Sequence, residues 1–107
     1  LMVEFLGKRK RLFNLLKSQG FDVKIEEFLQ VGYSYEFDMF LFQEVGYPLL
    51  NNLVMGLFPG AYSVTSLSEY FATGFERFYM REGKNLSKMC PVLVKKIDYL
   101  DEIANEY

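Results

Sequence analysis

Apolar side chains recur every three or four residues in three stretches of the chain, which is the spacing of an amphipathic helix. These stretches cover residues 3–19, 66–81 and 87–107. In the second stretch, Glu69 follows Ser66 by three residues, and this capping-box spacing marks a helix N-terminus. The pattern therefore predicts three helices, one of them with a defined start.

Two further stretches are apolar but less regular. Residues 35–58 are the most apolar part of the chain and have a helical pattern, yet Pro48 lies inside it. Proline lacks an N–H and crowds the preceding turn, so we expect a kink or two helices that meet there. Residues 21–28 are ambiguous, because residues 21–26 alternate apolar and charged side chains with the period of a strand. The expected fold is mainly α, with α+β as the alternative: about four helices and at most one short hairpin or strand.

The chain is short and rich in large apolar side chains. It has 107 residues, of which 50% are hydrophobic and 18% are aromatic. This length fits one domain, residues 1–107, and the apolar content is typical of a folded chain. The sequence begins with Leu1 rather than Met, which is compatible with a piece of a longer protein. No stretch reaches the roughly 20 apolar residues that span a bilayer, so we expect no membrane span. The sequence does not indicate a compartment.

The charges are nearly balanced. The formal net charge is −2, so we expect no nucleic-acid partner for the chain as a whole. A basic run lies within the first predicted helix and consists of Lys8, Arg9, Lys10 and Arg11. We interpret this run as a solvated helix face, with a contact to a phosphate or an acidic partner as the alternative.

Few residues are available for chemistry. The chain has no histidine, which excludes histidine-based triads, metal sites and general bases. It has one cysteine, Cys90, so an internal disulfide and a paired-cysteine metal site are excluded as well. Cys90 precedes Pro91 in an apolar stretch, and we expect a small buried hydrophobic side chain there. We therefore expect no enzyme activity, no cofactor and no metal.

Two segments together resemble part of a metalloprotease site. The segment Q-E-V-G-Y, residues 43–47, has the spacing of the H-E-x-x-H motif, with other residues in place of both histidines. The segment A-Y-S-V-T-S-L-S-E-Y-F-A-T-G-F, residues 61–75, follows it. This combination is similar to the site of the anthrax-lethal-factor-like zinc proteases, over residues 40–100. The resemblance implies that Glu44 corresponds to the general base, Tyr62 to the oxyanion-binding tyrosine and Glu69 to the third zinc ligand.

The residues at the former histidine positions argue against zinc binding. Gln43 offers a neutral amide, and Tyr47 binds metal only after it loses a proton. A single remaining carboxylate does not replace three protein ligands. The resemblance thus implies a degenerate zincin-like domain that serves as a protein–protein interaction or docking module, as in toxins, phages or mobile elements. Tyrosines combine a large apolar area with a polar tip, and the candidates for partner contact are Tyr33, Tyr35, Tyr70 and Tyr79.

Two alternatives remain open at this point. The first is a small helical adaptor or inhibitor unrelated to zincins, in which Glu44 and Glu69 lie far apart on the surface. The second is a metal-free hydrolase that uses Glu44 and Glu69 as an acid and base pair, which requires both carboxylates in one cleft.

Overall fold

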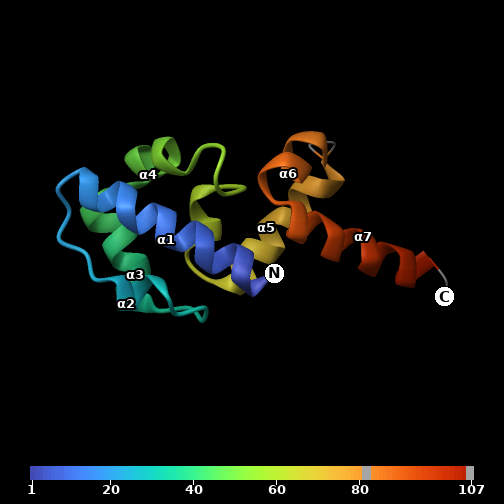
Figure 1. Cartoon of the computed structure of the whole chain (residues 1–107), viewed down its shortest axis with the longest axis horizontal. Coiled ribbons are helices and arrows are strands. Elements are labelled where there is room, and N and C mark those ends of the chain that lie inside the picture. Colours follow the sequence, from blue (N-terminus) through green and yellow to red (C-terminus); the bar gives the residue numbers. More distant parts are fainter. Residues whose placement is uncertain (81–82, 106–107) are drawn as a thin grey trace.

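The computed structural model describes residues 1–80 and 83–105, and within them the chain is mainly helical (Figure 1). The α-helices number seven rather than about four, and a π-helix (η1) and a 3₁₀-helix (η2) accompany them. In chain order the elements are α1 (Met2–Ser18), α2 (Ile25–Phe28), α3 (Tyr35–Met39), η1 (Phe40–Val45), α4 (Tyr47–Val54), η2 (Ala61–Val64), α5 (Leu67–Tyr79), α6 (Gly83–Met89) and α7 (Pro91–Asn105). These described segments contain no strand.

The additional helices have three sources: α2 forms where a strand was expected, α6 begins before the predicted helix 87–107 and is separated from α7 at Cys90, and the stretch 35–58 is divided. The stretch 35–58 contains three elements, α3, η1 and α4, and the last two are separated at Gly46, which has a φ of 82°. This conformation is readily available only to glycine. Pro48 then lies in the first turn of α4, where a missing N–H costs no hydrogen bond. The predicted meeting of two helices near Pro48 is therefore confirmed, and the break itself lies at Gly46.

The alternating stretch 21–28 does not form a strand. Residues 21–24 have no regular secondary structure, and α2 begins at Ile25. An isolated extended segment has no neighbouring strand with which to form hydrogen bonds. The alternation instead turns the half-buried side chains of Phe21, Val23 and Ile25 toward the core.

The molecule is elongated, with extents of 49 × 23 × 19 Å. Helix α1 runs along one end of the molecule beside α2 and α4, and it also reaches α5. Helix α5 packs on η2, α6 and α7, while α7 extends to the opposite end (Figure 1). Gly74 of α5 is tightly packed, because an added Cβ would lie only 2.9 Å from Cγ of Leu93 on α7. A glycine is thus required for α7 to lie this close to α5.

Arg9 corrects the interpretation of residues 8–11 as a solvated helix face. Its side chain is 1% exposed, and its guanidinium lies over the rings of Phe5 and Phe37 at 4.8 and 4.4 Å. It donates hydrogen bonds to five backbone carbonyl oxygens, those of Val64 (2.6 Å), Thr65 (3.0 Å), Gln30 (3.2 Å), Phe28 (3.3 Å) and Glu27 (3.5 Å). Lys8 is half-buried and donates to the carbonyl oxygen of Met89 at 2.7 Å, whereas Lys10 and Arg11 are exposed as expected. Burial lowers the pKa of Arg9 to about 10, so the side chain remains a cation at neutral pH.

Glu4 links α1 to α5 and to α7. Its carboxylate accepts hydrogen bonds from the hydroxyl of Tyr70 (2.5 Å) and from the backbone N–H groups of Val92 (2.8 Å) and Leu93 (3.3 Å). The last two belong to the first turn of α7, where N–H groups have no partner within the helix. Cys90 is fully buried beside this cluster, as predicted, and burial raises the pKa of its thiol.

None of the described helices combines the length and the apolar character needed to cross a membrane.

Candidate functional site

The two former histidine positions do not share a helix face. Gln43 lies on η1, which ends at Val45, whereas Tyr47 begins α4 after the turn at Gly46. In H-E-x-x-H, a continuous α-helix places two ligands one turn apart on the same side. Here, the backbone changes direction between the two positions, so the geometry of the motif is not present.

The three residues of the zincin-like frame lie on three different elements. Glu44 is exposed on η1, where it borders a shallow hollow of about 470 Å³ whose boundary includes neither Tyr62 nor Glu69. Tyr62 is 45% exposed on η2. Glu69 is half-buried in the first turn of α5, and its backbone N–H donates to the Ser66 side chain at 3.1 Å. No hydrogen bond between described residues joins the three, and no group of three or more acidic or cysteine side chains in these ranges is arranged to hold a metal ion.

Tyr70 is not available to a partner. It is one of the four tyrosines that we expected to contact a partner, but its side chain is fully buried and donates to Glu4. Burial, followed by the hydrogen bonds to Cys90 and Glu4, raises its pKa. The other three candidates, Tyr33, Tyr35 and Tyr79, are each more than half exposed.

A buried carboxylate organises the tyrosines near α3. Asp38 is 6% exposed and accepts hydrogen bonds from the hydroxyls of Tyr33 (2.7 Å) and Tyr47 (3.5 Å). The hydrogen bond to Asp38 is the largest cause that raises the pKa of Tyr33 to about 12. For Tyr47 the pKa is also raised, mainly by burial. No local pattern in the sequence marks Asp38, because a single Asp in a helical stretch resembles any solvated carboxylate.

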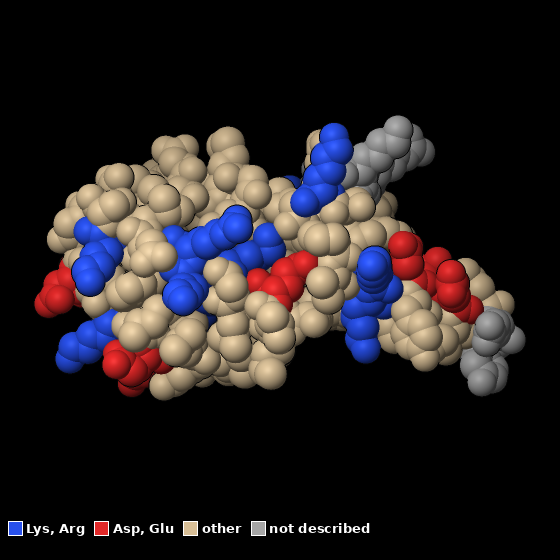
Figure 2. All heavy atoms as spheres, viewed as in Figure 1, with Lys and Arg blue, Asp and Glu red and all other residues tan. Residues whose placement is uncertain are grey.

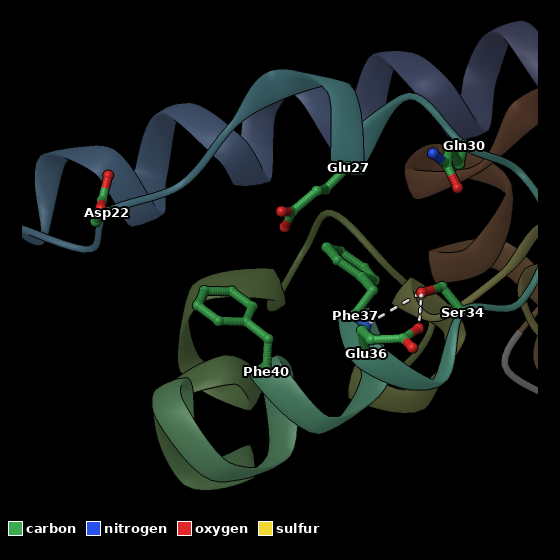
Figure 3. A pocket seen from close by; sticks show the side chains of 7 residues that line it. All are labelled: Asp22, Glu27, Gln30, Ser34, Glu36, Phe37 and Phe40. Atoms are coloured by element: carbon green, nitrogen blue, oxygen red, sulfur yellow. Dashed lines mark hydrogen bonds between the residues drawn. The ribbon is translucent and has the colours of Figure 1, made fainter.

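A second hollow lies between α2 and α3, and Figure 3 shows it from close by. Its volume is about 330 Å³, and its lining residues are Asp22, Glu27, Gln30, Ser34, Glu36, Phe37 and Phe40. Glu27 extends from α2 toward the ring of Phe37 (Figure 3). The Ser34 hydroxyl donates to the carboxylate of Glu36 at 3.3 Å and accepts a hydrogen bond from the backbone N–H of Phe37. Ser34 therefore caps the N-terminus of α3 with its side chain.

The two hollows adjoin, since Glu36 and Phe40 line both. We call their combined lining the acidic groove, and its four carboxylates belong to Asp22, Glu27, Glu36 and Glu44. Among the described residues, no lysine or arginine lines either hollow. The local sequence has the same bias, because residues 22–44 contain six carboxylates and one lysine.

The opposite charge gathers elsewhere on the molecule. In the view of Figure 2, lysine and arginine side chains lie along α1. The acidic groove and the basic side chains of α1 thus belong to different parts of the surface, although the net charge is only −2.

Comparison with known proteins adds no assignment: no family model, no curated protein and no solved structure matches the chain.

Proposed function

We propose that the domain is a non-catalytic docking module whose acidic groove binds a basic segment of a partner protein. This proposal rests on four carboxylates that surround two adjoining hollows. Within residues 1–80 and 83–105, no lysine or arginine lines either hollow. Such a surface attracts lysine and arginine side chains and disfavours acidic ones.

The rings of the groove add a second source of affinity. Tyr35 is 64% exposed and borders the same hollow as Glu36 and Phe40. An arginine side chain binds a carboxylate through its N–H groups and stacks on an aromatic face through its plane. Arginine-rich segments are therefore the expected ligands, more than lysine-rich segments of equal charge.

A labelled arginine-rich peptide of about twelve residues is a suitable probe, with binding measured by fluorescence anisotropy at low salt. The test variant is Glu27→Lys combined with Glu36→Lys. The matched control is Glu76→Lys combined with Asp98→Lys, which makes the same change of net charge at exposed positions on α5 and α7. Each exposed ion pair contributes about 0.2–1 kcal/mol, and a reversal replaces this attraction by a repulsion of similar size, so two reversals in the groove weaken binding about fourfold or more.

The control decides whether the groove itself is the site. We expect the control variant to weaken binding much less than the groove variant, because its charges lie outside the two hollows. Equal losses in both variants would mean that the peptide responds only to net charge, and the proposal would then be rejected. An acidic peptide that binds as tightly as the basic one would reject it as well.

The absence of catalysis is part of the same proposal. The chain has no histidine, and Glu44 borders a hollow that does not include Glu69. Calorimetric titration with zinc is expected to give no tight site. A stoichiometric site of nanomolar affinity would overturn this part of the proposal and restore the protease frame.

The zincin-like origin is a separate hypothesis about ancestry. The turn at Gly46, which separates Gln43 from Tyr47, favours the alternative of a small helical adaptor unrelated to zincins. The docking function does not depend on which ancestry is correct, because the acidic groove is defined by its own residues.

A further inference from the structure

Helix α7 has an outer face that no other described element covers. Its inner side chains Leu93, Val94 and Ile97 are buried, whereas Val92 and Tyr99 are 42% and 58% exposed. The helix extends away from the rest of the molecule and forms one of its ends (Figure 1). The spacing of seven residues places Val92 and Tyr99 on one face of the helix, with the exposed Lys95 between them.

The charges on this helix follow a definite order. Lys95 and Lys96 lie in its N-terminal half, and Asp98, Asp101 and Glu102 follow in its C-terminal half. Asp101 is already engaged, because it accepts a hydrogen bond from Tyr79 of α5 at 2.6 Å. Lys95 and Glu102 are exposed, and their spacing of seven residues places both on the same flank of the outer face.

We infer that α7 is a self-association surface, on which α7 of a second copy packs antiparallel across a two-fold axis. In such a pair, each contact between two different residues occurs twice. An axis midway between residues 95 and 102 places Lys95 of each copy opposite Glu102 of the other copy. The same axis passes beside Tyr99, so the two exposed rings meet at the centre of the interface. A parallel pair would instead place lysine opposite lysine.

The size of the surface sets the expected affinity. A helix of 15 residues is about 22 Å long, so one helix pair covers less than the roughly 1,200–2,000 Å² of a standard interface. Self-association is therefore weak and depends on concentration, with a dissociation constant of about 10 µM to 1 mM. This inference concerns α7 alone and does not rest on the function proposed for the acidic groove.

Sedimentation equilibrium at protein concentrations up to about 1 mM tests the inference with two variants of the full chain, Lys95→Glu and Glu102→Lys. Alone, each variant places like charges opposite each other twice, so dimerisation weakens about fourfold or more. In an equimolar mixture, a mixed dimer again has opposite charges at both contacts: one contact joins the two substituted side chains, and the other joins the two original ones. The mixture is therefore expected to regain the dimer of the unchanged chain. Both positions are exposed, and circular dichroism is expected to show an unchanged fold.

The mixture distinguishes this geometry from other ways to dimerise. The inference is overturned if the unchanged chain stays monomeric at about 1 mM, or if both single variants dimerise as well as it does. It is also overturned if the mixture associates no more strongly than either variant alone. As a second measurement, Tyr99→Ala is expected to weaken the dimer at least as much, whereas Tyr99→Phe retains it.

Discussion

Replacement of Arg9 by methionine tests whether the buried cation holds the domain together. Methionine keeps the unbranched apolar stem and removes the guanidinium, so the core loses its charge without a large cavity. The change affects the contacts of α1 with the segment around α2 and with the end of η2, because the five carbonyl acceptors come from these two regions. A large loss of stability is the expected result.

The magnitude follows from the hydrogen bonds. Those to charged groups contribute about 1.5–3 kcal/mol each, so the three shortest, to Val64, Thr65 and Gln30, sum to roughly 4.5–9 kcal/mol. Part of this is offset, because the variant no longer has the desolvation cost of several kcal/mol for a buried guanidinium. We therefore expect Arg9→Met to lower the free energy of unfolding by about 3–5 kcal/mol. This is a large part of the roughly 5–15 kcal/mol typical of a small domain.

Urea unfolding followed by far-ultraviolet circular dichroism measures the effect. Arg11→Met is the matched control, because Arg11 lies two residues further along the same helix and is exposed. The control is expected to change the free energy of unfolding by less than about 0.5 kcal/mol. If Arg9→Met stays within about 1 kcal/mol of the unchanged chain, the buried hydrogen bonds do not stabilise the fold and the reasoning is refuted.

Two further predictions concern α5 and the tyrosine cluster. Gly74→Ala is expected to destabilise the domain by about 1–3 kcal/mol in the same assay, because the new methyl group overlaps the buried Leu93. The control is Gly7→Ala, which has no atom within 4 Å of the new Cβ and is expected to stabilise the domain by about 0.5–1 kcal/mol. If Gly74→Ala also stabilised the domain, α7 would be free to move away from α5. The pKa of Tyr33 is about 12, above its ordinary value of 10.0. Its hydrogen bond to Asp38 therefore stabilises the fold fully below pH 10, and this contribution is lost as the pH rises through 12. In NMR titration of the tyrosine rings, Asp38→Asn is expected to lower this pKa toward 10.0, and an unchanged pKa would contradict the assigned cause.

The features that the sequence predicted well are those that depend on neighbouring residues. Helical spacing in residues 3–19 predicted α1, and the pair Ser66 and Glu69 predicted the start of α5, where the Ser66 side chain accepts the expected hydrogen bond. Helix caps and apolar periodicity act over three or four residues, so they are visible in a short window of sequence. The number of helices was underestimated, because a break such as Gly46 needs only one residue in an unusual conformation.

The burial of individual charged and aromatic side chains depends on contacts between distant parts of the chain. Arg9 and Arg11 look alike in the sequence, yet Arg9 is buried because carbonyl groups up to 56 residues away converge on it. Tyr70 looked as suitable for a partner as Tyr35, until packing enclosed it beside Glu4. Local sequence thus determined where helices form and which side chains are apolar. Only the tertiary structure decided which charged and aromatic groups are buried and which surround a hollow, because burial depends on the elements that pack over a residue.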